Sequence, residues 1–148
     1  MFKPSRILVP TDFSETSLKA VQQAFDIAKQ HGAEVFVVHV VDRPASDCAF
    51  DYCISEEQVK PIQAKMEESA RKEIQNQLSK IPDMGSVKVS PNVRMGTPYE
   101  EILNEADVNN VDLIVISSFG FKKIARLLLG SVARQVMMGA VCSVLLVR

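Results

Sequence analysis

Nearly continuous apolar runs alternate along this chain with segments in which apolar residues recur every three or four positions. Continuous runs are typical of parallel strands covered on both faces, and the three-to-four spacing is typical of helices with one buried face. The expected strands cover residues 6–10, 34–41, 87–95, 111–117 and 143–147. The third is the weakest, and because it contains Pro91, which lacks a backbone donor, we place it at a sheet edge.

The segments between these strands predict four helices. In the first, Leu18, Val21, Phe25 and Ala28 share one face, and Gly32 suits its end. The other three are expected over residues 55–80, 97–106 and 131–138, with a loop over 42–54.

The third helix carries the most explicit start signal. Thr97 is expected as its cap and Pro98 as its first residue, and Glu100 would complete a capping box. The fourth helix is expected to end at Gly139. Strands that alternate with helices in this way predict an α/β fold, a three-layer sandwich with a parallel sheet between helices.

Length and charge narrow the class of protein. The 148 residues suit one domain, residues 1–148, and the formal net charge of -1 argues against nucleic-acid binding. The apolar run at the start is too short for a signal peptide and no stretch is long enough to span a membrane, so we expect a cytoplasmic protein. The three cysteines and two histidines show no metal-ligand spacing, and we expect reduced thiols and no protein-bound metal.

Ligands of open parallel sheets bind at the carboxyl ends of the strands, where the strand order reverses. If the order is 3-2-1-4-5, the reversal lies between the first and fourth strands. The two most unusual loops follow those strands, over residues 11–17 and 117–132. Composition and topology therefore indicate the same crevice.

The loop after the fourth strand has the features of an anion site. Gly120 and Gly130 would let a ligand approach the backbone closely, and Ser131 is expected to cap the following helix. The free N–H groups of a helix start attract anions, and a triphosphate would suit them. The alternative is a glycine turn and a capped helix with no ligand.

The loop after the first strand offers a carboxylate and several hydroxyls. Asp12 could accept hydrogen bonds from a ribose or a base, or hold a water on a metal ion, and hydroxyls come from Thr11, Ser14, Thr16 and Ser17. Alternatively, Asp12 or Ser14 caps the first helix. Val40 would line a base pocket, or it is a core valine.

With these residues the chain resembles the universal stress protein family over nearly its whole length. The resemblance is carried by ILVPTDFSETSLKAV, HVVD, GTPYEEI, LLLGSVARQVM and SVLLVR. ATP-binding members have a glycine, two residues, a glycine, nine residues, and then Gly followed by Ser or Thr. Here the corresponding residues are Ser117, Gly120, Gly130 and Ser131.

The resemblance implies a five-stranded parallel sheet of order 3-2-1-4-5 and a homodimer that pairs through the last strand. It also implies that ATP is bound, with Mg²⁺ or Mn²⁺ held mainly by its phosphates. Asp12 would contact ribose or base, Val40 the adenine, and the glycine loop the phosphates. The residues expected at the nucleotide are Pro10, Thr11, Asp12, Val40, Ile116, Ser117, Gly120, Gly130, Ser131 and Val132.

Other functions stay open. Ser117 stands where the stricter motif has glycine, which favours a dimeric interaction module of the same fold that binds no nucleotide. A flavodoxin-like protein could bind its flavin phosphate with the hydroxyls of residues 11–17. A receiver domain would need an acceptor aspartate at the end of the third strand, where this chain has Arg94. No general base is evident near the phosphates, His39 reads as a core residue, and we expect at most slow ATP hydrolysis.

Overall fold

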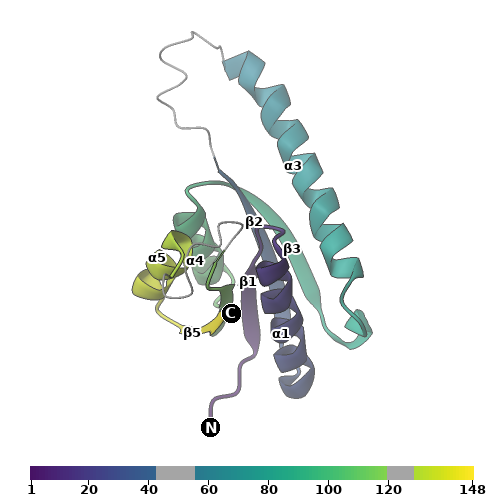
Figure 1. Ribbon diagram of the computed structural model, residues 1–148, viewed down its shortest axis with the longest axis vertical. Coiled ribbons are helices and arrows are strands. Elements are labelled where there is room, and N and C mark those ends of the chain that lie inside the picture. Colours follow the sequence, from purple (N-terminus) through teal and green to yellow (C-terminus); the bar gives the residue numbers. More distant parts are fainter. Residues whose placement is uncertain (43–55, 120–128) are drawn as a thin grey trace.

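The computed structural model describes residues 1–42, 56–119 and 129–148. Five strands form one parallel sheet in the order β3-β2-β1-β4-β5, as predicted (Figure 1). The strands are β1 Arg6–Pro10, β2 Glu34–Asp42, β3 Val89–Gly96, β4 Leu113–Ser117 and β5 Ser143–Val147. The carboxyl ends of β1 and β4 are therefore neighbours.

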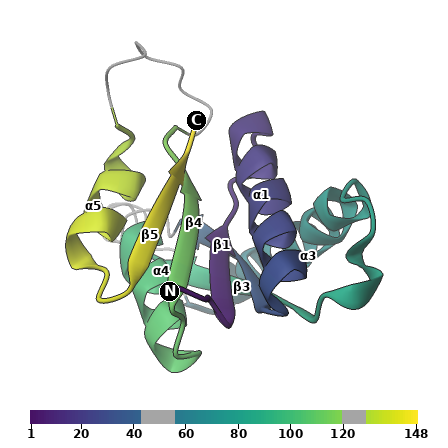
Figure 2. The same ribbon diagram turned by 90° about the horizontal axis from the view of Figure 1, so that it is seen from below.

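Helices cover both faces of the sheet, which confirms the three-layer α/β arrangement (Figure 2). Helices α1 and α3 lie on one face, and α4 and α5 lie on the other. The helical segments are α1 Glu15–His31, α3 Glu56–Ser79, the 3-10 turn η1 Met84–Ser86, α4 Pro98–Val108 and α5 Ser131–Gly139.

The strand residues divide between two cores. Val9, Val37 and Val115 pack on the side of α1, with Phe25 of that helix. Leu8 and Ile116 pack on the side of α4 and α5. Because successive strand residues point to opposite faces, a strand with both faces buried is apolar throughout. This explains the continuous apolar runs of the sequence.

Pro91 lies within β3 at the edge of the sheet, where a missing donor costs no ladder bond, and this confirms the expected edge position of the strand. Two expectations for the start of α4 were wrong. Helix α4 begins at Pro98 as predicted, but the Thr97 side chain makes no capping bond. Glu100 forms no capping box either, and its Oε1 accepts from the Tyr99 hydroxyl at 3.0 Å.

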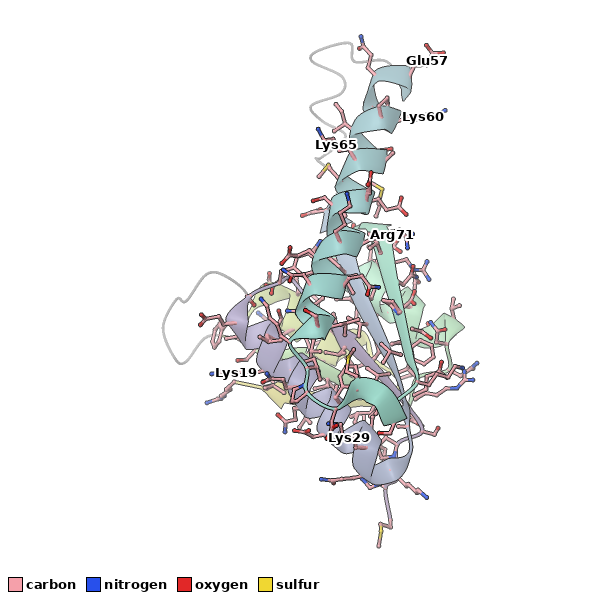
Figure 3. The ribbon with its side chains drawn as sticks, turned by 90° about the vertical axis from the view of Figure 1, so that its right-hand side faces the viewer. Lys19, Lys29, Glu57, Lys60, Lys65 and Arg71 are labelled. Carbon is pink, nitrogen blue, oxygen red and sulfur yellow. The ribbon has the colours of Figure 1, made fainter. Side chains whose placement is uncertain are left out.

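Helix α3 extends beyond the sheet at its amino-terminal half (Figure 1). On this half, Ile62 and Met66 are 60% and 41% exposed. The charged side chains of Glu57, Lys60 and Lys65 point outward from it (Figure 3). Within the described parts of the chain, no helix combines the length and the apolar character that a membrane span requires.

Candidate nucleotide site

A cavity of about 590 Å³ lies at the carboxyl ends of β1 and β4. This volume lies within the usual range of small-molecule sites. Nine of the ten residues expected at the nucleotide line it: Pro10, Thr11, Asp12, Val40, Ile116, Ser117, Gly130, Ser131 and Val132. The tenth, Gly120, lies outside the described residues. The structure thus brings the two loops together, while the contacts of each residue with a ligand stay predictions.

The cavity also has walls that the sequence reasoning missed. Pro98 and Ile102 of α4 close one side of the cavity. In the sequence, the GTPYEEI segment that contains them predicts the start of a helix and does not by itself indicate a cavity wall. The other unexpected lining residues are Val38, His39, Ser118, Phe119, Leu129 and Ala133. Because most of these residues are apolar, the cavity can take the flat apolar surface of a base as well as charged groups.

The end of β4 is joined directly to the start of α5. The Gly130 N–H donates to the Ser118 carbonyl oxygen at 2.8 Å. A Cβ at position 130 would lie 3.0 Å from this oxygen, closer than side chains normally approach. Glycine is therefore needed for the close approach and not for an unusual φ, since φ is -58° at this residue.

The first turn of α5 carries no side-chain cap, which corrects the expectation for Ser131. Gly130 occupies the cap position, Ser131 is the first helical residue, and its side chain makes no capping bond. The first bond of the helix runs from the Arg134 N–H to the Gly130 carbonyl. The N–H groups of residues 131–133 have no partner among the described residues, and they lie at the positive end of the helix dipole.

Asp12 does not cap α1, because Ser14 does. Ser14 Oγ accepts from the Ser17 N–H at 3.2 Å, and Asp12 Oδ1 accepts from the Ser14 N–H at 3.0 Å. The second carboxylate oxygen of Asp12 has no partner among the described residues. One oxygen therefore holds the loop in place, and the other can accept from a ligand hydroxyl or amine.

The hydroxyls of this loop are engaged within the protein. Thr11 Oγ1 donates to Gln77 Oε1 at 2.6 Å, and Ser17 Oγ donates to the Ser14 carbonyl at 2.9 Å. Thr16 Oγ1 donates to the Phe119 carbonyl at 2.6 Å, which ties α1 to the end of β4. Hydroxyls used in this way cannot bind a flavin phosphate, which disfavours the flavodoxin-like alternative.

His39 belongs to the structural wall of the cavity. Its Nδ1 lies 2.8 Å from the Thr11 carbonyl oxygen, to which it donates because a carbonyl can only accept. Its ring stacks on Phe13 with the centroids 4.2 Å apart. Phe13 has a φ of 66°, which is strained for a bulky residue. The stacked pair and the Thr11 bond together hold the backbone turn after β1.

The end of β3 excludes a receiver-type acceptor. Arg94 donates from Nε to Glu105 Oε2 at 2.6 Å, and the same buried carboxylate accepts from Asn92 and Asn109. The cluster joins α4 to the sheet.

Among the residues that the structure describes, no three His, Cys, Asp or Glu side chains are grouped as a metal site would require.

Comparison with known proteins agrees with this fold. The model of the Universal stress protein family matches residues 3–148, and the chain belongs to that family. The universal stress protein MJ0531 of Methanocaldococcus jannaschii is 35% identical over 97% of this chain and 81% of its own length. The solved structure of the hypothetical protein MJ0577, also of Methanocaldococcus jannaschii, has a TM-score of 0.80 and 30% identity, and covers 97% of this chain and 94% of its own.

Two more distant solved structures share the fold and contain nucleotides. A universal stress protein in complex with cAMP has a TM-score of 0.65 and 24% identity, and covers 99% of this chain and 98% of its own. The universal stress protein from Archaeoglobus fulgidus in complex with dAMP has a TM-score of 0.57 and 23% identity over the same shares. Both ligands are adenine nucleotides.

Proposed function

We propose that this chain is a single nucleotide-binding domain that binds ATP in the cavity at the ends of β1 and β4 and acts as a dimeric stress-response or signalling protein. The observation that carries the proposal is the uncapped start of α5, where the N–H groups of residues 131–133 lie at the cavity wall and have no partner within the described parts of the chain. A helix start whose N–H groups are not used by the protein is a favourable place for phosphates. The close approach at Gly130 keeps this turn next to the end of β4.

The other parts of ATP have matching groups. Asp12 presents a carboxylate oxygen that can accept from a ribose hydroxyl, and Val40 and Ile116 offer apolar surface to the adenine. The remaining residues of the expected set, Pro10, Thr11, Ser117 and Val132, complete the walls. The complexes with cAMP and dAMP support the class of ligand, because the same fold accommodates an adenine nucleotide in those proteins.

The phosphates would hold Mg²⁺ or Mn²⁺ largely by themselves. Asp12 is the one carboxylate among the described residues that line the cavity, which is too few ligands for a site made by the protein alone. Among the described residues of the cavity we find no side chain placed to act as a general base at the γ-phosphate, and we expect any hydrolysis to be slow. The protein would then signal through whether the site holds a nucleotide, and not through the rate at which it hydrolyses ATP.

The second strand edge supports dimer formation. β5 is at the open edge of the sheet opposite β3. The neighbouring Met137, Met138 and Val141 are 47%, 78% and 93% exposed. An exposed edge strand beside exposed apolar side chains favours pairing with a second copy. A Val141→Glu variant should shift sedimentation toward the monomer, and an unchanged dimer would contradict pairing at this edge.

The alternative of a dimeric module without nucleotide is favoured by one observation. Ser117 lines the cavity and carries a Cβ where the stricter motif has glycine. If its Cβ crowds the ligand, the dimer contacts would be the whole function.

The cytoplasmic location stays a prediction from the sequence.

The proposal is tested by calorimetric titration of ATP and of adenosine, with Mg²⁺, into the wild type and into Ser131→Glu and Ser131→Gln variants. Ser131 is exposed at the first position of α5, where a carboxylate stabilises a helix. Ser131→Glu should therefore fold normally, lose ATP and keep adenosine, because its charge repels the phosphates. Ser131→Gln is the neutral control of the same size and should keep both ligands. A folded wild type that binds neither ligand would refute nucleotide binding and leave the interaction module.

A further inference from the structure

The Ser118 hydroxyl is the one buried side-chain polar atom without a hydrogen-bond partner among the described residues. Ser118 is 2% exposed, so water does not satisfy this group. Buried polar groups in folded proteins nearly always have partners, and an exception calls for a physical reason. The main-chain groups of the same residue are both satisfied, by Val147 and by Gly130.

The position of Ser118 relates this hydroxyl to the start of α5. The Ser118 N–H donates to the Val147 carbonyl at 2.7 Å, which continues the β4–β5 ladder one residue beyond β4. Ser118 follows β4 in a bend, and it lines the cavity together with Ile116. The bond from Gly130 to the Ser118 carbonyl places this residue directly beside the first turn of α5.

We infer that Ser118 is a further ligand-binding residue, whose hydroxyl donates a hydrogen bond to a phosphate oxygen of the bound nucleotide. This assignment rests on the proposed function and extends it. A phosphate at the start of α5 would accept from the N–H groups of residues 131–133, which no other described residue uses, on one side and from Ser118 Oγ on the other. Rotation about χ1 is sufficient to turn a serine hydroxyl toward an acceptor.

The chemistry of the group supports a phosphate and not a base as the partner. A hydroxyl can donate to any acceptor, but hydrogen bonds to a charged oxygen are stronger than those to a neutral one. The adenine is expected at Val40 of β2, whereas Ser118 adjoins the α5 start, where the anion is expected. A bound phosphate would then give the hydroxyl, once turned out of its buried rotamer, the partner that it lacks among the described residues.

The test compares wild type, Ser118→Ala and Ser86→Ala by calorimetry with ATP, AMP and adenosine, and by thermal unfolding with and without ATP. Ser86 is an exposed serine of η1, outside the cavity, and serves as the matched control. Ser118→Ala should weaken ATP about tenfold, the usual order for one hydrogen bond to a charged group. It should leave adenosine unchanged, and AMP shows whether the α-phosphate is the acceptor. Ser86→Ala should change none of these.

Unfolding without ligand separates a binding role from a structural one. Replacing an unpartnered buried hydroxyl by a methyl group should leave the melting temperature equal or higher, while the rise produced by ATP becomes smaller. A lower melting temperature of unliganded Ser118→Ala would overturn the inference, because the hydroxyl would then have a structural partner. Equal ATP affinity in wild type and variant would also overturn it, as would an equal loss for adenosine. Failure of the folded wild type to bind any of the ligands would instead refute the proposed function itself.

Discussion

Gly130 and Ser118 are twelve positions apart in the chain, yet the N–H of the first donates to the carbonyl oxygen of the second at 2.8 Å. The contact leaves little space for a side chain, because a Cβ on Gly130 would lie 3.0 Å from that oxygen. It joins the end of the strand at which the cavity forms to the helix start that would bind the phosphates. The geometry of the proposed phosphate site should therefore be sensitive to a methyl group at position 130.

Gly130→Ala should push the α5 start away from β4. We expect weaker ATP binding, with adenosine affected less, and a loss of about 1 kcal/mol in unfolding free energy, as is usual for a small overpacking change. Gly85→Ala is the matched control, since nothing lies within 4 Å of a Cβ there. Calorimetry and urea unfolding measure the two effects. Full ATP affinity in Gly130→Ala would show that the close approach is not required.

Asp12→Asn separates the two roles of the Asp12 carboxylate. An asparagine carbonyl can still accept from the Ser14 N–H, so stability should not change. The outer oxygen becomes an NH₂ donor, and ATP and adenosine should both bind about tenfold or more weakly, because an acceptor for the ribose is lost. Titration of both ligands measures this. If Asp12→Asn lowered the stability of the protein together with its affinity for both ligands, Asp12 would act only by holding the loop in place.

Glu105→Ala should destabilise the fold without removing a residue that lines the cavity. Glu105 is 4% exposed and accepts from Arg94, Asn92 and Asn109. Its removal leaves these donors without their acceptor, and we expect a loss of about 3 kcal/mol, the lower end for a broken buried pair. Glu68→Ala removes an exposed partner of Lys72 and should have no measurable effect. Urea unfolding compares the two, and similar midpoints would contradict the difference.

Glu34→Gln should lower stability in a way that depends on pH. The hydrogen bond from Lys88, at 2.9 Å, lowers the pKa of Glu34 below its ordinary value of 4.5. A lowered folded-state pKa contributes stability that is present above pH 4.5 and disappears as the pH falls through the folded-state pKa. The urea midpoints of wild type and variant should differ at neutral pH and converge in acid. A difference that does not vary with pH would assign the effect to packing or to the bond from Ser90.

Local pattern was enough to predict the secondary structure, because the spacing of apolar residues is itself local. The strands around Leu8, Val37 and Ile114 are buried on both faces and read as unbroken apolar runs, so their positions were predicted closely. The spacing of apolar residues does not indicate the order of the strands in the sheet. The family resemblance implies this order, and the sheet confirms it.

The position of some cavity residues was predictable from residue type and place in the chain, as for Asp12 after a strand or Gly130 before a helix. Roles that depend on a partner distant in sequence were not. The sequence allowed Asp12 or Ser14 to cap α1, and only the folded loop assigns the cap to Ser14. It suggested Ser131 as a cap, whereas the structure leaves the α5 start open.

By itself, the sequence determined which segments become strands and helices and which two loops differ from ordinary turns. The tertiary structure decided which polar groups of those loops are used internally and which stay free. The hydroxyls of Thr11 and Thr16 donate to Gln77 and Phe119, while the Ser118 hydroxyl beside α5 has no partner in the described ranges. Hydrogen bonding acts over about 3 Å, and only the packing of helices on the sheet brings groups so far apart in the chain to that distance.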